Sequence, residues 1–150
     1  MSHTPEWKCL PFPALSVDEL HAILRLRVDV FVVEQQCPYP EIDGQDPSAI
    51  HLFARGSDGL LLCYARLLPP AADGHPHIGR VVVHPEHRRE QLGRAVMIEA
   101  IARCRALFGP VPVALSAQAH LHAFYTSLGF HPTSEAYMWD GIPHIDMLLP

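Results

Sequence analysis

Apolar residues recur along the chain in two spacings, and their alternation predicts a mixed order of strands and helices. Short apolar runs of strand length alternate with segments in which apolar residues return every three or four positions, as they do on one face of a helix. We expect strands at residues 6–10, 51–55, 60–68, 78–83, 111–115, 132–139 and 144–149, and helices at about 17–32, 93–108 and 118–128. The fold class indicated is α/β, with an α+β mixed sheet.

Local signals mark several ends of these elements. Ser16 and Glu19 have the spacing of a capping box and predict a helix start. The segment 56–59 begins and ends with glycine and predicts a hairpin turn between two strands. The second of these strands is apolar nearly throughout, as expected of a strand covered on both faces. Gly129 suits the end of the third helix.

Composition and charge narrow the class of protein. The chain has 150 residues, of which 49% are hydrophobic and 18% charged, so we expect one globular domain over residues 1–150. The sequence holds no run of about 18 apolar residues, and its first 13 residues lack the layout of a signal peptide, so we expect a cytoplasmic protein without membrane contact. The net charge of −5 argues against nucleic acid as a partner.

Cysteine and histidine spacing gives no metal motif. The four cysteines, at positions 9, 37, 63 and 104, are far apart and form no CxxC pair. Three of the four lie in apolar contexts typical of buried residues. The eleven histidines include close pairs but no HExxH, so we expect no metal. Lys8 is the only lysine, and the many arginines have two interpretations: planar recognition of phosphate or carboxylate, or a GC-rich genome.

The most informative stretch is an apolar strand followed by a basic turn and a helix. Arg88 and Arg89 lie in the turn, Gly93 opens the helix, and Arg94 lies in its first turn. A helix start offers free backbone N–H groups and the positive end of the helix dipole, which together bind phosphate. The alternative is a solvated turn that caps an ordinary helix. Because GxxxxGK[ST] and GxGxxG are both absent, ATP and NAD are poor candidates for the ligand.

These motifs resemble the GNAT superfamily of acyl-CoA-dependent N-acyltransferases. The matching pieces are V-x-P at 83–85, R-x-x-x-x-G-R-A at 88–95 and F-Y-x-x-x-G-F at 124–130. Segments 31–39, 42–44, 116–121 and 140–145 are similar to the ElaA-like branch of bacterial GNAT proteins. The chain departs from the family pattern at Gln91, which replaces the first glycine of the loop. We therefore expect Gln91 to adopt an unstrained φ or to turn its side chain outward.

The resemblance implies a fold and a cosubstrate. The fold would be a central mixed, mostly antiparallel sheet flanked by helices, and the cosubstrate would be acetyl-CoA, with its pantetheine arm lying like an extra strand beside residues 78–83. A backbone N–H there would polarise the thioester carbonyl. The residues implied in binding are Val81, Val82, Val83, Arg88, Arg89, Glu90, Gln91, Leu92, Gly93, Arg94 and Gln118.

The resemblance also implies catalytic candidates. Tyr125 matches the tyrosine that protonates the leaving thiolate in many GNAT enzymes, although it also lies on the apolar stripe of its helix. The general base is open between Glu34, His120, His144 and a chain of waters. Four acids and no basic residue lie within residues 34–46, which fits either a cationic acceptor or a solvated acidic loop: Glu34, Glu41, Asp43 and Asp46.

The function expected is therefore acetyl transfer to a primary amine by direct attack, with Tyr125 as general acid. The amine would belong to a small molecule, to a lysine or to a protein N-terminus. The alternative is a catalytically silent acyl-CoA-binding or interaction module on the same fold, because fold alone does not give function. The exposed ends of a mixed sheet also allow a homodimer.

Overall fold

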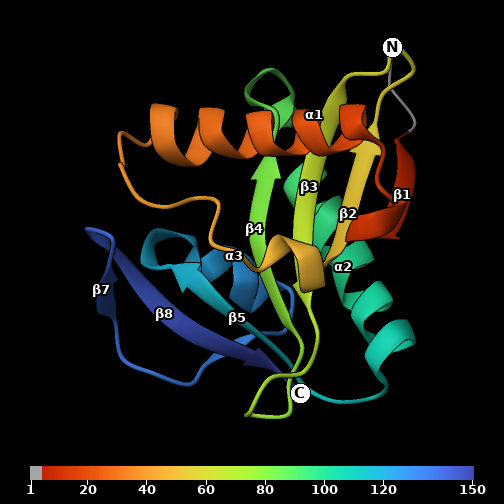
Figure 1. Ribbon diagram of the computed structural model, residues 1–150. Helices are drawn as coiled ribbons and strands as arrows, with labels where there is room; N and C mark the ends of the chain where they lie inside the picture. The colour runs from red at the N-terminus through yellow and green to blue at the C-terminus, as the bar shows by residue number, and fades with distance from the viewer. Residues whose placement is uncertain (1–4) are drawn as a thin grey trace.

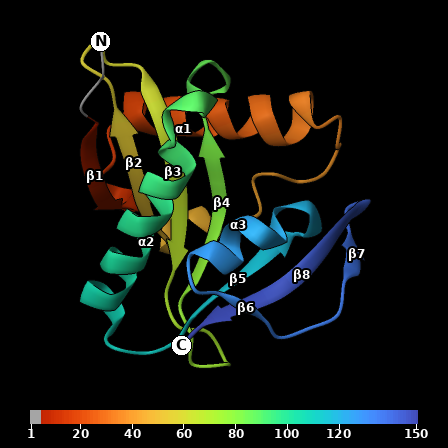
Figure 2. The same cartoon turned by 180° about the vertical axis from the view of Figure 1, so that it is seen from behind.

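The computed structural model describes residues 5–150 and forms an eight-stranded sheet with helices on both faces (Figures 1 and 2). The strand order is β1-β2-β3-β4-β5-β8-β6, with β7 also paired to β8. Only the β4–β5 pair is parallel among the pairs described, which confirms the mixed, mostly antiparallel sheet. The strands are β1 (Glu6–Pro11), β2 (Ile50–Arg55), β3 (Leu61–Leu68), β4 (His77–Val83), β5 (Val113–Gln118), β6 (His131–Pro132), β7 (Tyr137–Trp139) and β8 (Ile142–Leu149).

Helices cover the two faces of the sheet unequally. The α-helices are α1 (Val17–Val28), α2 (Leu92–Phe108) and α3 (His122–Ser127). Shorter helical segments are η1 (Phe12–Ala14), η2 (Asp29–Glu34), η3 (Asp46–Ser48), η4 (Pro85–Glu90) and η5 (Ala119–Leu121). Figure 1 shows α1 crossing one face of β2, β3 and β4, and Figure 2 shows α2 and α3 on the other face. Each face therefore has its own apolar core, and β3 is buried by both, as predicted.

The first helix begins as predicted but ends differently. The Ser16 hydroxyl accepts a hydrogen bond from the Glu19 backbone at 3.0 Å, and the Glu19 carboxylate accepts one from the Ser16 backbone at 2.8 Å, which completes the capping box. We predicted one helix to residue 32, whereas the α-helix ends at Val28 and the chain continues as the π-helix η2 to Glu34. The bond from Gln35 N–H to the Val30 carbonyl, 3.1 Å, has the wider π spacing.

The last third of the chain corrects the sequence prediction most. A helix was expected from residue 118, but Gln118 is the last residue of β5, because β5 pairs with β8 up to Gln118 and His144 and stays extended. The predicted strand 132–139 divides into β6 and β7. Gly129 ends α3 as predicted: its φ is +102°, and a Cβ there would lie 2.9 Å from Leu149 Cδ1.

Candidate active site

The sheet opens between β4 and β5. The parallel pair is joined at a single register position, His77 with Ala114, near the start of both strands, whereas β4 pairs with β3 as far as Val83. Figure 1 shows the two strands diverging beyond that point. The end of β4 thus keeps one backbone edge without a partner strand among residues 5–150. The structure fits an extended ligand arm in this place, which is the place predicted for pantetheine.

A β-bulge lies in β4 just before this edge. Val82 pairs with Tyr64, but the next pair along is Gly79 with Arg66, so two residues of β4 face one residue of β3. The bulge residue Arg80 has φ +53°, in the left-handed region. The bulge was not predicted, because an arginine inside an apolar strand pattern gives no signal for a positive φ.

The turn into α2 keeps the backbone path of a glycine. Gln91 has φ +57° and ψ +28°, the left-handed conformation. Of the two alternatives expected from the sequence the second holds, because the Gln91 side chain is exposed. A Cβ on Gly93 would lie 3.9 Å from Val83 and 3.9 Å from Phe124. The start of α2 therefore lies beside both the open end of β4 and the helix that carries Tyr125.

The predicted cofactor-binding residues fall into two groups. Arg88 and Arg89 are exposed in η4, and Arg94 is exposed in the first turn of α2. Leu92 and Val82 are buried in the two cores, so only their backbone groups are free to meet a ligand. The Glu90, His87 and Arg94 side chains also have protein contacts: Glu90 with His87 at 2.6 Å and Arg94 with Ser127 at 3.3 Å.

Arg88 already has an anionic partner. Its guanidinium makes two hydrogen bonds to the Glu34 carboxylate, one of them 2.9 Å between Nη1 and Oε2. Both side chains are more than 40% exposed, at 44% and 43%. The hydrogen bond from Arg88 holds the pKa of Glu34 below its usual value. The ion pair joins two residues that sequence analysis assigned to different roles, cofactor binding and general base.

The end of η2 lies against both sides of the opening. Glu34 contacts Arg88, which follows β4, and the next residue, Gln35, accepts a hydrogen bond of 3.3 Å from the Gln118 side chain at the end of β5. Gln118 thus lies at the opening, and its contact with the cofactor stays a prediction. Gln35 was not predicted, because a glutamine in a helical segment carries no signal of its own.

Tyr125 is buried against two aromatic rings. Its ring centroid lies 5.1 Å from that of Phe124 and 6.1 Å from that of Phe130, and 7% of the residue is exposed. Burial raises the pKa of Tyr125 to about 12, so the phenol keeps its proton at neutral pH. Its hydroxyl has no hydrogen-bond partner within residues 5–150. The core packing weighed from the sequence is confirmed, and the hydroxyl remains available to a ligand.

The three candidate bases differ in their surroundings. Glu34 is held by Arg88, and His120 is exposed in η5. His144 is half-buried, and its Nδ1 lies 2.7 Å from the Ile142 carbonyl oxygen. Because a carbonyl only accepts hydrogen bonds, Nδ1 carries the proton and the neutral ring leaves Nε2 as an acceptor. His144 pairs with Gln118 across β5 and β8, which places it at the open end of that pair.

Three acids of the loop after η2 are paired with arginines. Three arginines from α1, β3 and β4 bind these acids beneath the loop, and we call this set the acid–arginine network: Arg27, Arg66, Arg80, Glu41, Asp43 and Asp46. The Nε–Oε2 distance from Arg27 to Glu41 is 2.7 Å, and Nη1–Oδ1 from Arg27 to Asp46 is 2.8 Å. All three carboxylates are paired with arginines. Glu41 and Asp46 are buried in these pairs, so the solvated-loop interpretation is wrong for these two, whereas Asp43 is paired and remains exposed.

Burial and ion pairing act in opposite directions on these acids. Burial by itself would raise the pKa of Asp43 and of Asp46. Hydrogen bonds from Arg66 to Asp43 and from Arg27 to Asp46 outweigh burial, so both pKa values lie below their usual range. Asp43 and Asp46 are therefore charged at neutral pH, and the ion pairs of the network fix the loop to the sheet.

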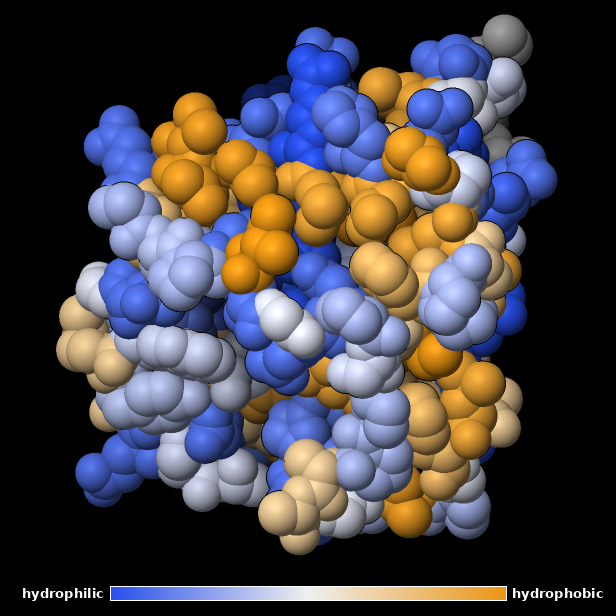
Figure 3. All heavy atoms as spheres, viewed as in Figure 1, coloured by the Kyte–Doolittle hydropathy of each residue, from blue (hydrophilic) through white to orange (hydrophobic). Residues whose placement is uncertain are grey.

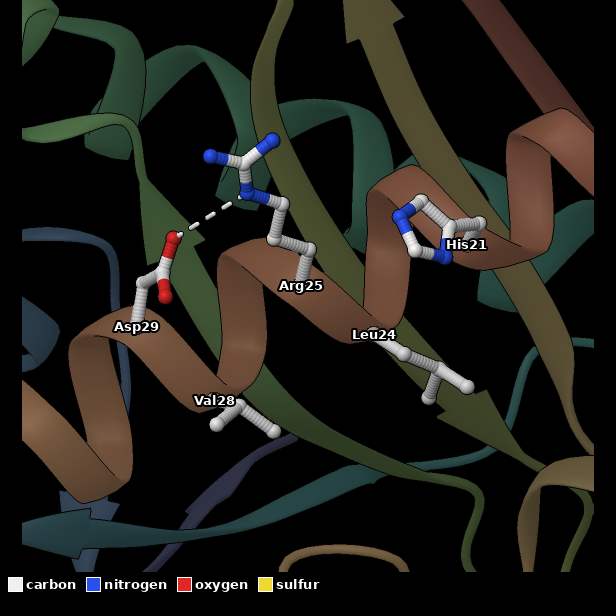
Figure 4. A pocket seen from close by; sticks show the side chains of 5 residues that line it. All are labelled: His21, Leu24, Arg25, Val28 and Asp29. Atoms are coloured by element: carbon white, nitrogen blue, oxygen red, sulfur yellow. Dashed lines mark ion pairs between the residues drawn. The ribbon is translucent and has the colours of Figure 1, made fainter.

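Other surface features have weaker claims to be the site. Apolar residues gather over α1 and the segment after it (Figure 3). A shallow depression there is lined by His21, Leu24, Arg25, Val28 and Asp29 (Figure 4). Its one cation, Arg25, lies 3.7 Å from the Asp29 carboxylate and is thus already paired. Among residues 5–150 there is no cluster of three or more residues suited to a metal ion, and no helix is long and apolar enough to cross a membrane.

Comparison with known proteins assigns the family. Residues 25–149 match the family described as the acetyltransferase (GNAT) domain. The protein ElaA of Escherichia coli (strain K12) is 45% identical over 144 residues, which are 95% of this chain and 94% of ElaA. The crystal structure of an acyl-CoA N-acyltransferase from Pseudomonas aeruginosa is similar with a TM-score of 0.93 and 45% identity, over 98% of this chain and 100% of that one. The crystal structure of Escherichia coli ElaA is similar with a TM-score of 0.91 and 42% identity, over 98% of this chain and 100% of that one.

The chain therefore belongs to the GNAT acetyltransferase family. It is an N-acetyltransferase in class, and its fold is one that binds acyl-CoA. The open edge of β4, the start of α2 and the exposed arginines are the features of this chain that fit such a ligand.

Proposed function

We propose that the chain transfers the acetyl group of acetyl-CoA to a primary amine by direct attack, with the amine on a small molecule, a lysine or a protein N-terminus. The observation that carries this proposal is the opening between β4 and β5. An unpaired backbone edge, the start of a helix with three exposed arginines, and the helix bearing Tyr125 all border it. The bound thioester supplies an activated acyl group there.

The first step is binding and orientation. The free N–H groups at the start of α2 and the side chains of Arg88, Arg89 and Arg94 hold the pyrophosphate. The backbone of Val81 to Val83 forms strand-like hydrogen bonds with the extended arm. An N–H of this edge points at the acyl oxygen and stabilises the negative charge that develops as the amine attacks.

Two side chains move protons in the proposed reaction. Tyr125 is protonated across the neutral range because burial raises its pKa to about 12, and it donates to the sulfur as negative charge develops there. His144 takes the proton of the ammonium through Nε2, because its Nδ1–H is held by the Ile142 carbonyl. The contact with Arg88 lowers the pKa of Glu34 and so weakens it as a base, and within residues 5–150 the exposed His120 has no contact that would orient it.

The release of CoA thiol from acetyl-CoA tests the proposal, with pooled polyamines, amino acids, lysine peptides and aminoglycosides as acceptors. Release above the background without acceptor is expected. Tyr125→Phe should lower kcat about 10²-fold with little change in acetyl-CoA affinity. Its thermal midpoint should stay that of the parent, since the hydroxyl has no hydrogen-bond partner within residues 5–150. An unchanged kcat would remove Tyr125 from the mechanism.

His144→Gln tests the base separately. The amide keeps a polar side chain but cannot accept a proton at neutral pH, so kcat should fall at least 10-fold near pH 7. At higher pH, where more of the acceptor amine is already neutral, the difference from the parent should shrink. A loss that is the same at every pH would assign His144 a structural role.

Two further outcomes concern the alternatives. Stabilisation by acetyl-CoA with no thiol release in any pool would favour the silent binding module. The measured mass in solution tests the proposed homodimer.

A further inference from the structure

Arg80 combines a strained backbone with a fully engaged side chain. It lies at the bulge of β4 with φ +53°, a conformation in which glycine is the usual residue. Gly79 precedes it directly and is not among the residues of positive φ. The left-handed conformation thus falls on the arginine although a glycine is next to it, which indicates that contacts of the arginine side chain hold it there.

Those contacts come from the loop after η2. Arg80 Nε lies 2.9 Å from Glu41 Oε2, and Nη2 lies 3.3 Å from the Glu41 carbonyl oxygen and 3.3 Å from Asp43 Oδ2. The guanidinium carbon is 5.5 Å from the centroid of the Tyr39 ring. Only 17% of the Arg80 side chain and 3% of that of Glu41 are exposed. We call this set of contacts to Glu41, Asp43 and Tyr39 the Arg80 clamp.

The clamp fixes the strand segment that the proposed reaction uses. The His84 N–H donates to the Leu62 carbonyl at 2.7 Å, on the β3 side. Because successive N–H groups along a strand point to opposite edges, the Val83 N–H points to the open side. The bulge lies between this segment and the regular start of β4, and a bulge sets the direction and twist of the residues that follow it.

We propose that Arg80 is a positioning residue: through Glu41 and Asp43 it holds the β4 bulge so that the Val83 N–H, on the open edge, points at the acyl oxygen. This inference rests on the proposed function. Arg80 itself touches neither the acyl group nor the amine. The loop after η2 thereby controls the polarisation of the carbonyl rather than the binding of the phosphates.

The test measures the acyl carbonyl directly. Acetyl-CoA labelled with ¹³C at the carbonyl is bound to the parent chain and to Arg80→Ala, Arg80→Gly and Arg80→Lys, and the shift of the carbonyl signal on binding is recorded. Calorimetry gives the Kd of CoA, and thiol release gives kcat and KM. The matched control is Arg103→Ala, which removes an arginine paired with Glu99 on α2, away from β4.

The proposal gives an order of effects. Arg80→Ala should lose most of the downfield carbonyl shift and at least 10-fold in kcat, while the Kd of CoA changes less than about 3-fold. Arg80→Gly, which adopts φ +53° without strain, should keep part of the shift, and Arg80→Lys should restore part of it through its charge. Arg103→Ala should match the parent.

Two results would overturn the proposal. A parent-like carbonyl shift in Arg80→Ala would show that the bulge needs no clamp. If Arg80→Ala does not fold, a parent-like shift and kcat in Arg80→Gly would show the same. Neither result touches the proposed function, which fails separately if the parent chain shows no carbonyl shift and no thiol release.

Discussion

Arg27, Arg66 and Arg80 lie beneath the loop after η2, with side chains at most 17% exposed, whereas Arg88 at the start of α2 is 44% exposed. The buried arginines share three acids that come from one short loop. The exposed arginine has one carboxylate, and solvent reaches both partners. A buried arginine whose guanidinium is already paired with carboxylates stabilises the fold. An exposed arginine with one solvent-accessible carboxylate partner, near a helix start, can exchange that partner for a phosphate.

The largest effect should come from breaking the buried acid–arginine network. Arg27→Met leaves Glu41 and Asp46 without their closest cation in a place that water does not reach, so the free energy of unfolding should fall by about 3–5 kcal/mol. Urea denaturation measures it. Arg103→Met, which breaks an exposed pair on α2, should change stability by less than about 0.5 kcal/mol. A loss below about 1 kcal/mol in Arg27→Met would mean that the loop is fixed by other contacts.

An intermediate effect should come from removing the exposed arginine Arg88, and it should change the affinity for CoA without changing stability. Arg88→Ala removes a charged hydrogen-bond donor to phosphate, worth about 1.5–3 kcal/mol, so the Kd of CoA should rise roughly 10- to 100-fold. The thermal midpoint should change little, because the pair with Glu34 is exposed. Arg25→Ala, from the exposed pair on α1, is the control and should bind CoA as the parent does. Equal affinity in Arg88→Ala and the parent would place the phosphates elsewhere.

The smallest effect should come from the partner that Arg88 must give up. Glu34→Gln removes the charge that competes with phosphate for Arg88, and exposed pairs are worth about 0–1 kcal/mol, so the Kd of CoA should fall up to about 5-fold. Calorimetry at low and high salt checks it, since the gain should shrink as salt screens the pair. If Glu34 were instead the general base, kcat would fall with little change in CoA affinity, and this one variant distinguishes the two roles.

The exposed and the buried arginines also differ in how well the sequence predicts their roles. The exposed arginines belong to a strand, turn and helix start that are contiguous in the chain, so spacing alone indicated them. The buried arginines meet acids that lie 14 to 39 residues away, and such contacts exist only in the folded chain. One signal was present: Arg66 interrupts an apolar strand, and a buried charge needs a partner, which the acid-rich loop could have supplied.

The order of the elements was predicted better than their ends and local backbone conformation. The order of strands and helices followed from apolar spacing, and the capping box and the hairpin turn were confirmed. The errors gather where backbone conformation depends on distant partners. The extension of β5 to Gln118 depends on β8, and the left-handed conformation of Arg80 coincides with contacts from the Glu41 loop. At Gln91 the sequence left two alternatives open, and a positive φ with an exposed side chain is the second of them.

The single register position that joins β4 to β5 has a consequence for how the molecule unfolds. Strands β1 to β4 and strands β5 to β8 form two hydrogen-bonded ladders that are tied by one residue pair. Beyond that pair, the two ladders are held together by side chains of the core that α2 and α3 cover, including Val96, Leu115 and Tyr125. The opening between β4 and β5 is thus crossed by side-chain packing more than by backbone hydrogen bonds, and we expect amide protons of the two ladders to exchange through different opening events.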